Sequence, residues 1–404
     1  MAARRAGGSA VSANIGPLAG VKVVDLSVMI SGPLAAMMLA DQGAEVIKVE
    51  SPGIGDMMRF LGSQKGGITG IFALHNRGKK SIGLNLKSDK GREILRDLMK
   101  DADVVIQNFR PGALEKLGFG YDDVRTFNDR VVYVSISGFG PDGPRSGQRV
   151  YDNVIQAASG LASVQTDKAT GRPQVFRTLV CDKVTSYTVA QAVTAALFAR
   201  ERGRGGQHIE ISMLDSAIAF MWPDSAMDAA LLDDDVARTP TIGENYAALE
   251  LKDGFVTVSA VSQPEFEGYC AALGNPDLAK DPRFADAAAR SANTAELRLE
   301  IKKLTDAITV EQFLANAVTF DVPASGINTL HNVHEEPQVL HNGTFVVRDH
   351  PKAGSIREAR NAPHFRGTPT SMPATAPDRG EHSDEIVTAL GLDASALRAE
   401  GVIF

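Results

Sequence analysis

Two neighbouring stretches decide the fold class: Val21-Lys22-Val23-Val24-Asp25-Leu26 and Ala44-Glu45-Val46-Ile47-Lys48-Val49. Both are rich in β-branched residues, which favour strands. Between them stand the turn Gly32-Pro33 and a stretch with helical spacing from Leu34 to about Asp41. Gly43 suits the C-terminal end of that helix. The succession strand, helix, strand predicts the first unit of a parallel sheet.

The same alternation continues along the first half of the chain. Strands are predicted over 81–86, 104–106 and 131–137, and the capping signal Ser88-Asp89 begins a helix that runs to about Lys100. Nearly continuous apolar strands separated by helices predict a parallel sheet covered on both faces, a Rossmann-like, doubly wound α/β domain. The first turn has one glycine where dinucleotide-binding folds have G-x-G-x-x-G, so NAD(P) is not expected there.

The second half of the chain predicts a different architecture. Helices are predicted over 151–161 and 185–202, a strand over 207–212, and a helix from Leu214. From Asn245 the signals restart, with strands near Glu250 and over 255–260 and helices over 264–273, 295–305 and 310–319. This pattern predicts a smaller α+β domain. After Pro337 the composition predicts irregular structure as far as a helix over 383–390.

Composition excludes several classes of function. A chain of 404 residues with 44% hydrophobic and 23% charged residues is typical of a globular protein with two domains. No apolar run approaches the ~18 residues of a membrane span. The net charge of −7 argues against a nucleic-acid partner, which requires a basic surface. A local basic pocket for a small anion remains compatible with that charge.

The N-terminus and the cysteines indicate a compartment. The first 16 residues hold two arginines and many small residues without a long apolar run, which predicts a flexible tail and no secretory signal. Two cysteines, Cys181 and Cys270, are too few for a disulfide framework or a zinc cluster. A reducing cytoplasm is therefore the expected location.

Two basic segments stand beside strand signals. Asn76-Arg77-Gly78-Lys79-Lys80-Ser81 leads into Leu84-Asn85-Leu86-Lys87, and Asn108-Phe109-Arg110-Pro111-Gly112-Ala113-Leu114-Glu115-Lys116 leaves the end of the strand over 104–106. Ligands of open α/β sheets bind outside the carboxyl ends of strands, where we expect both segments. Lysine and arginine there can hold phosphates through charge-assisted hydrogen bonds. Solvated surface charge is the alternative, but several clusters in an acidic protein favour a polyanionic ligand.

Asp182 precedes a predicted apolar helix in Thr178-Leu179-Val180-Cys181-Asp182-Lys183. One interpretation is a helix N-cap. The other is a carboxylate nucleophile that divides an acyl transfer into two easier steps, kept ionised by the helix dipole. Spacing alone does not choose between them.

Several other chemistries lack their motifs. The eight histidines form no H-E-x-x-H site, so no metal is expected. No G-x-S-x-G elbow is present, which argues against a serine hydrolase. Cys181 could be a nucleophile, but a buried small residue is the more ordinary interpretation.

The chain resembles the class III CoA-transferases over nearly its whole length, from about Gly16 onward. The segments that carry the resemblance are 17–26, 43–50 with 52–56, Lys80-Ser81-Ile82-Gly83-Leu84-Asn85, Asn108-Phe109-Arg110-Pro111-Gly112, Ser137-Gly138-Phe139-Gly140, Tyr151-Asp152-Asn153, Gly203-Arg204-Gly205-Gly206-Gln207 and Gly380-Glu381-His382. Each segment is weak evidence by itself, and together they are highly specific.

The resemblance implies a fold, an assembly and a site. It implies a large CoA-binding domain over 17–225, a small domain over 240–335, and a segment over 345–404 that returns to the large domain. It implies an intertwined homodimer of interlocked rings, and it places the catalytic aspartate at Asp182. The implied contacts to the substrates, acyl-CoA and a carboxylic acid, are Ile30, Leu84, Lys87, Asn108, Phe109, Arg110, Ala113, Lys116, Leu117, Arg149 and Tyr151. No other cofactor is implied.

Two positions separate branches of this family. Racemases of the family have a histidine where Tyr151 stands, and a tyrosine with a pKa near ~10 is a poor proton shuttle. Tyr151 therefore favours transfer over racemisation. Formyl-CoA transferases have a glutamine at the position of Ile30 and a glycine-rich loop where 239–246 has one glycine. Both departures argue against formyl-CoA and oxalate, and Ile30 with Met29 favours a larger or less polar acyl group.

We therefore expect an enzyme that transfers CoA from an acyl-CoA to a carboxylic acid through an aspartyl anhydride and an aspartyl-CoA thioester at Asp182. Two alternatives remain open at this point. One is an acyl-CoA racemase or epimerase that uses Asp182 with a second base. The other is a CoA-binding protein without catalysis.

Overall fold

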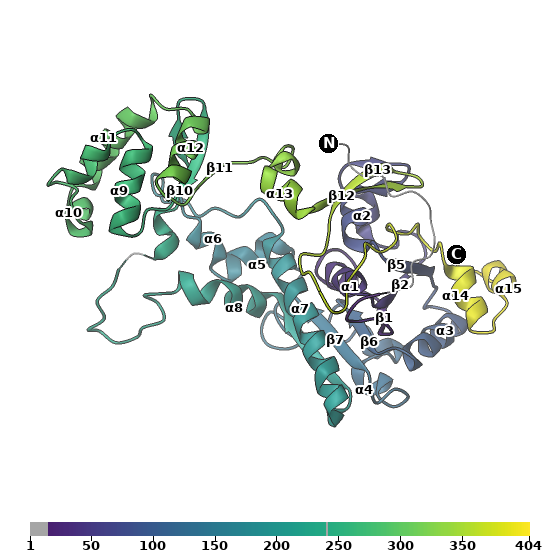
Figure 1. Ribbon diagram of the computed structural model, residues 1–404. Helices are drawn as coiled ribbons and strands as arrows, with labels where there is room; N and C mark the ends of the chain where they lie inside the picture. Colours follow the sequence, from purple (N-terminus) through teal and green to yellow (C-terminus); the bar gives the residue numbers. More distant parts are fainter. Residues whose placement is uncertain (1–14, 240) are drawn as a thin grey trace. The chain divides into compact units, whose positions relative to one another are not determined.

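The computed structural model describes residues 15–239 and 241–404 (Figure 1). The predicted N-terminal tail falls almost entirely on residues 1–14, outside the described residues. The chain divides into two compact units, one of which runs as far as Val236 and resumes over Gly343–Phe404. The other unit is Ala237–Asn342. Within the described ranges no helix combines the length and apolarity needed to cross a membrane.

Among the described residues, the first unit is built on a six-stranded sheet in the order β5-β2-β1-β6-β7-β8. Each neighbouring pair of strands is parallel. Numbered along the chain, this order is 3-2-1-4-5-6, which is the Rossmann order. The strands are β1 (Lys22–Asp25), β2 (Glu45–Glu50), β5 (Lys79–Gly83), β6 (Val104–Gln107), β7 (Val132–Ser137) and β8 (Gln207–Ser212). The predicted α/β class and parallel sheet are confirmed.

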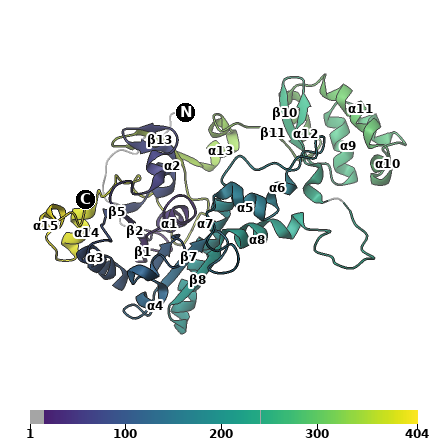
Figure 2. The same cartoon turned by 180° about the vertical axis from the view of Figure 1, so that it is seen from behind.

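Helices cover both faces of this sheet because successive side chains of a strand point to opposite faces. Val23 packs with helices α1 (Ser31–Asp41) and α7 (Val180–Ala199) on one face. Val24 packs on the other face with helices from distant parts of the chain (Figure 2). Those helices are α3 (Asp89–Lys100), α4 (Tyr121–Val124), α14 (Ser383–Ala389) and α15 (Ala394–Ala399).

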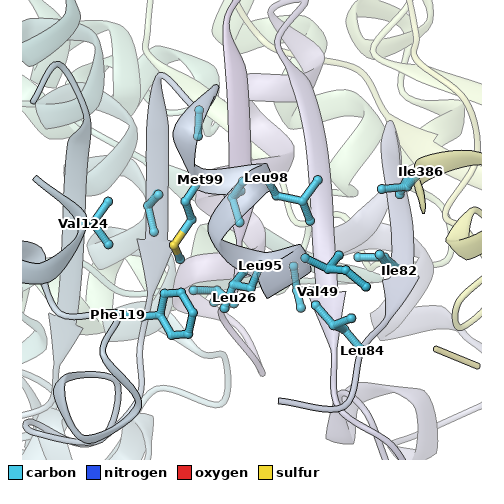
Figure 3. Packing of buried hydrophobic residues seen from close by; sticks show 14 of the residues in the cluster. Leu26, Val49, Ile82, Leu84, Leu95, Leu98, Met99, Phe119, Val124 and Ile386 are labelled. Atoms are coloured by element: carbon cyan, nitrogen blue, oxygen red, sulfur yellow. The ribbon is translucent and has the colours of Figure 1, made fainter. Parts of the chain in front are cut away.

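Figure 3 shows the core on the α3 side, where Leu95 and Met99 lie over Leu26, Val49 and Ile82. The predicted start of α3 is confirmed, since the Ser88 hydroxyl accepts a hydrogen bond from the Gly91 amide. Burial of an aliphatic side chain of this size contributes about 1.5–3 kcal/mol, so this cluster holds the sheet and its covering helices together.

The remaining elements of the first unit lie between β2 and β5 and between β7 and Val236. They are β3 (Gln64–Lys65), β4 (Ile68–Thr69), α2 (Gly70–Asn76), α5 (Asp152–Ala158), α6 (Leu161–Val164) and α8 (Met213–Ser225). The helix predicted over 151–161 is wrong in its extent, because Gly160 has a φ of 90° and separates α5 from α6. The helix predicted from residue 185 also begins earlier, at Val180.

The segment Gly343–Phe404 completes the first unit. Its β12 (Phe345–His350) and β13 (Gly354–Ala359) pair in an antiparallel hairpin, so the irregular structure predicted after Pro337 is wrong there. Helix α14 confirms the helix predicted over 383–390, and the amide of Phe404 donates to the carbonyl of Gly83 on β5. Any side chain at Gly83 would collide with the Phe404 ring, which accounts for the glycine.

The second unit is α+β, as predicted. Its described residues form a three-stranded antiparallel sheet in the order β11-β10-β9, packed with helices around Phe266, Phe284 and Phe313. The strands are β9 (Leu249–Leu251), β10 (Gly254–Val258) and β11 (Ala324–Gly326). The helices are α9 (Gln263–Ala272), α10 (Ala287–Ala292), α11 (Thr294–Thr305), α12 (Val310–Thr319) and α13 (Pro337–Asn342).

Candidate active site

The loop from β1 to α1 meets the first turn of α7 at the point where the strand order reverses. Asp182 is half-buried there, and its Oδ1 accepts a hydrogen bond from the hydroxyl of Ser31, the first residue of α1. The hydroxyl of Ser186, one turn further along α7, donates to the Ser31 carbonyl at 2.8 Å and to the Asp182 carbonyl at 2.8 Å. Two serines therefore link α1 to α7 around one carboxylate.

The structural interpretation of Asp182 as an N-cap is wrong. The N-cap of α7 is Leu179, and Asp182 is the third residue of the helix. Its backbone amide donates to the buried carboxylate of Asp152 at 2.9 Å, so a neighbouring side chain satisfies that amide. The amide of Gln156 donates in turn to Asp152 at 2.5 Å. The Asp182 carboxylate therefore does not cap α7, and its side-chain partner is the Ser31 hydroxyl.

Burial raises the pKa of Asp182 to about 6. The Ser31 hydrogen bond works in the opposite direction, and the negative charge of Asp152 adds to the increase. Within the described ranges no cation forms an ion pair with Asp182. A desolvated carboxylate without a counter-ion is more reactive than a solvated one, and it is still ionised at neutral pH.

A buried ionic network lies beneath the β1–α1 loop and fixes its shape. Lys79 pairs with Asp25 at 2.8 Å and donates to the Pro33 carbonyl at 2.9 Å. Lys48 donates to the Ser27 carbonyl at 2.8 Å and pairs with Asp56 at 2.9 Å. Both lysine side chains are fully buried. The buried Lys48 and Lys79 thus fix the backbone on either side of Ser31 through hydrogen bonds to its carbonyls.

The loop between β1 and α1 contains a residue with a strained backbone. Met29 has a φ of 65°, a region that residues with a side chain adopt only at a cost of about 1–3 kcal/mol. Its amide donates to the Asp56 carboxylate at 3.1 Å. Gly32 follows, where any side chain would collide with Ser27. Strain held in place by several contacts is typical of a functional loop.

Four basic residues implied by the resemblance are exposed: Lys87, Arg110, Lys116 and Arg149. None of them forms an ion pair with any carboxylate of the described ranges. Lys87 follows β5, while Arg110 and Lys116 follow β6, so these three come after carboxyl ends of parallel strands. Arg149 lies in the connection that leaves β7. All four cations are available to an anionic ligand.

The uncharged residues that the resemblance assigns to substrate contact divide into exposed and buried side chains. Phe109 is 37% exposed, Leu117 39% and Tyr151 69%, and Ala113 is half-buried, so each presents surface to a ligand. Leu84 is fully buried in the core against α3, and Ile30 is 2% exposed in a cluster with Met58, Ile68 and Phe72. The structure places the side chains of Leu84 and Ile30 inside the fold, where they shape the site without forming its surface.

Asn108 bridges two loops. Its Oδ1 accepts from the Val28 amide at 2.9 Å and its Nδ2 donates to the Val28 carbonyl at 2.7 Å. Both polar ends of the amide are therefore already paired within the chain. Asn108 joins the loop after β6 to the loop after β1 across the switch point.

The expectation that the segment 76–81 lies at the carboxyl end of a strand is wrong. Lys79 and Lys80 begin β5, so they lie at its amino end. Arg77 pairs with Asp41 at 2.6 Å and Lys80 with Glu385 at 2.7 Å, while Lys79 is paired with Asp25. These cations neutralise carboxylates of the fold, and none is free to hold a phosphate.

Sequence reasoning missed two residues of the site, Ser31 and Asp152. Ser31 had a signal, because it follows the first strand of a doubly wound fold, where ligands bind. Asp152 stood beside Tyr151 in a segment that carried the resemblance. Neither position predicts by itself which distant side chain it contacts.

Neither a cysteine nucleophile at Cys181 nor a metal site finds support in the described residues. Burial raises the pKa of Cys181 to about 12, so its thiol is protonated at neutral pH. Across residues 15–239 and 241–404 no group of three or more His, Cys, Asp or Glu side chains could hold a metal ion. Of the two candidate nucleophiles, Cys181 and Asp182, only Asp182 is ionised at neutral pH.

Comparison with known proteins gives the family. The family description CoA-transferase family III matches residues 18–383. The chain is 34% identical to the succinyl-CoA:glutarate CoA-transferase of Homo sapiens, over 93% of this chain and 86% of that protein. It is 32% identical to the succinyl-CoA:mesaconate CoA-transferase of Haloarcula marismortui, over 96% of this chain and 99% of that protein.

A solved structure shares the fold as well as the sequence. The crystal structure of a CAIB/BAIF family protein from Brucella suis superposes with a TM-score of 0.82 at 31% identity, covering 93% of this chain and 100% of that one. The chain belongs to CoA-transferase family III and is a CoA-transferase enzyme.

Proposed function

We propose that Asp182 is the covalent carrier in a transfer of CoA from an acyl-CoA thioester to a carboxylic acid. The carboxylate attacks the thioester carbonyl, which forms a mixed anhydride and releases the CoA thiolate. The thiolate then attacks the aspartyl carbonyl, which forms an aspartyl-CoA thioester and releases the donor's carboxylic acid as its anion. The acceptor carboxylate attacks this thioester, which forms a new anhydride and releases the CoA thiolate again. The thiolate then attacks the acyl carbonyl of the acceptor, which forms the new acyl-CoA and restores the Asp182 carboxylate. No step requires ATP or a metal.

The observation that carries this proposal is the environment of Asp182. The carboxylate is half-buried, has no paired cation among the described residues, and has a pKa raised to about 6 by burial. A structural carboxylate would be paired, as Asp25 and Asp41 are. A nucleophile must instead combine ionisation near pH 7 with weak solvation.

CoA would bind along the carboxyl edge of the sheet. We assign its phosphates to Lys87, Arg110, Lys116 and Arg149, because these are exposed cations without carboxylate partners. Phe109, Ala113 and Leu117 would contact the adenosine part, and Tyr151 would line the reacting centre. In this assignment CoA belongs to the domain over 17–225 with 345–404, and the domain over 240–335 takes no part in holding its phosphates.

We infer that the acids exchanged are dicarboxylic acids of about four or five carbons. Relatives that act on succinyl-CoA with glutarate or with mesaconate cover more than nine-tenths of this chain. The preference for a less polar acyl group rests on Ile30 with Met29, but Ile30 lies in the core and Met29 packs against the same cluster. A second carboxylate on the substrate would require a cation or amide donors in the acyl pocket.

We further propose that two chains form an intertwined homodimer in the cytoplasm. Exposed apolar side chains along α7 and α8 support an assembly, since Tyr187, Phe198 and Phe220 are each about 60% exposed or more. Patches of this kind on a globular protein are typical of protein interfaces. Two free, buried cysteines fit a reducing compartment.

Mass spectrometry after borohydride reduction tests the covalent mechanism. The protein is incubated with a panel of acyl-CoA thioesters, including succinyl-CoA and glutaryl-CoA, then reduced and digested. Reduction of an aspartyl thioester to an alcohol at Asp182 supports the mechanism, and the strongest signal identifies the donor. Exchange of the substrate α-hydrogen without an acceptor acid, with Asp182 unmodified, would support a racemase instead. CoA binding with neither reaction would indicate a non-catalytic protein.

A further inference from the structure

The two oxygens of the Asp182 carboxylate have different surroundings. Oδ1 accepts the hydrogen bond from the Ser31 hydroxyl. Of the side chains in the described ranges, none donates a hydrogen bond to Oδ2. Ser186, the other serine at this contact, reaches only backbone carbonyls. The backbone amide of Ser31 also stabilises the ionised carboxylate. Hydrogen bonding from side chains of the described ranges therefore reaches Oδ1 alone.

We propose that Ser31 is a further catalytic residue, whose hydroxyl keeps Oδ1 as the carbonyl oxygen of the aspartyl intermediates and leaves Oδ2 as the attacking atom. This inference rests on the proposed function, in which Asp182 is the covalent carrier. It adds to that mechanism a donor that acts when the aspartyl carbonyl is itself attacked.

The step that Ser31 assists is the return of CoA. The CoA thiolate attacks Cγ of Asp182 in the mixed anhydride, and a C–S bond forms while the electron pair of the C=O bond moves to Oδ1. The resulting oxyanion accepts the hydrogen bond from Ser31. Collapse restores the carbonyl and breaks the bond between Cγ and Oδ2, so the donor's carboxylate departs with Oδ2. No net proton is gained or lost.

A donor is effective in this role only if it is already oriented before the charge develops. Ser31 is 3% exposed, and its carbonyl is fixed by Ser186 on α7. The backbone of the next residues is fixed by Lys79, which donates to the carbonyl of Pro33. Ser31 is also the first residue of an 11-residue helix, whose dipole favours negative charge at that end.

The resting enzyme uses the same hydrogen bond in a different way. Ser31 stabilises the ionised carboxylate and so opposes the burial that raises its pKa. Loss of the hydroxyl would move the acidic limb of the pH–rate profile to higher pH. It would leave the affinity for acyl-CoA unchanged, because Ser31 contacts the nucleophile.

The experiment separates the two half-steps of acylation. It uses the thioester that labels the wild-type protein most strongly in the panel above. A coloured thiol reagent captures CoA as it is released, which reports attack by Asp182. Rapid quenching and intact-protein mass spectrometry without the reagent report the CoA adduct, which requires the thiolate to return. Cys181 and Cys270 are both buried, so they contribute little to the thiol signal.

Three variants give distinct outcomes. Ser31→Ala should release CoA within a few-fold of the wild-type rate but form the CoA adduct about 100-fold more slowly, the usual effect of losing one oxyanion donor. Ser186→Ala removes the hydroxyl that orients the Ser31 backbone but keeps the Ser31 donor itself, so it should slow adduct formation only a few-fold. Asp182→Ala should show neither signal.

Each contrary result identifies which idea fails. An adduct rate in Ser31→Ala equal to that of wild type, with Asp182→Ala inactive, would overturn the role of Ser31 alone. Equal losses in Ser31→Ala and Ser186→Ala, or equal losses of both signals in Ser31→Ala, would reduce Ser31 to a helix contact. Wild-type signals in Asp182→Ala would overturn the proposed function itself.

Discussion

The charged residues beneath the β1–α1 loop and those that follow the strands differ in how they are neutralised. Asp25, Lys48, Asp56 and Lys79 are fully buried and paired with one another. Lys87, Arg110, Lys116 and Arg149 are exposed and have no described carboxylate partner. Both groups belong to the same unit.

This difference separates the charges that hold the fold from those of the proposed binding surface. A buried charge is tolerated only when an opposite charge and hydrogen bonds replace its water, so the buried set is complete without any ligand. An exposed cation costs little when unpaired and retains its capacity to bind an anion. Asp182 belongs to neither group, because it is half-buried and unpaired. That intermediate state suits a group that must react.

The largest expected effect is the loss of one partner from the buried group. Lys79→Ala leaves the Asp25 carboxylate buried without its cation, which should lower the free energy of unfolding by about 3–5 kcal/mol. Urea unfolding followed by circular dichroism measures this change. The neighbouring Lys80 pairs with Glu385 in an exposed bridge, so Lys80→Ala should cost at most about 1 kcal/mol. Equal losses in the two variants would remove the distinction between buried and exposed charges.

The intermediate position of Asp182 predicts a variant that is more stable and inactive. The pKa of Asp182 is about 6 in the folded protein and near 3.8 in the unfolded chain. Above pH 6 the carboxylate is ionised in both states, and its burial then lowers the free energy of unfolding. Asp182→Asn should raise the free energy of unfolding near pH 7 by about 1–3 kcal/mol, after allowance for partial exposure. The gain should disappear as pH falls through about 6 towards 4, where the folded wild type binds its proton. Denaturant titrations at both ends of the window measure it.

The same pKa predicts how the rate depends on pH. Asp182 must be ionised to attack, so acylation should fall about tenfold between pH 7 and pH 5, with one proton involved. Stopped-flow release of CoA thiol across this range measures the profile. A flat profile over the same range would mean that Asp182 does not titrate during the rate-limiting step.

The exposed group should affect binding without affecting stability. Arg149→Ala and Lys116→Ala should each weaken CoA binding about tenfold, the effect of losing one charge-assisted hydrogen bond, and change the free energy of unfolding by less than about 0.5 kcal/mol. Calorimetry with CoA at two salt concentrations measures the affinity and its electrostatic share. Arg125 is exposed too but bridges to Asp122, so Arg125→Ala should bind CoA as wild type does and is the matched control. If Arg125→Ala weakened CoA binding as much as Arg149→Ala does, the cations would act through general charge attraction and not through a defined site.

The sequence predicts most of the first unit because its signals are local. β-branched runs predict the strands, Ser88 predicts the start of α3, and the strand predicted over 207–212 coincides with β8. The hairpin of β12 and β13 escapes this reasoning, because many prolines and glycines around it obscure two short alternating strands.

The site is less predictable because its contacts are distant in sequence. Composition cannot distinguish the buried Lys79 from the exposed Lys87, since the partner of Lys79 stands 54 residues away. The contact between Ser31 and Asp182 spans 151 residues, so no spacing rule could identify it. Only the resemblance singles out Asp182, because its local pattern is equally compatible with a helix cap.

The hydrogen bond between Phe404 and Gly83 has a consequence for synthesis. During translation, β5 leaves the ribosome more than three hundred residues before Phe404 reaches it, and the whole of Ala237–Asn342 is made in between. The unit Ala237–Asn342 has its own apolar core and can fold before the C-terminal segment is made. Until then the β5 edge of the six-stranded sheet lacks its C-terminal contacts. The amide of His382 also donates to the Ser81 carbonyl, and the Ser383 hydroxyl accepts from the Gly83 amide. A pause or truncation before His382 would therefore leave β5 open to pairing with other chains.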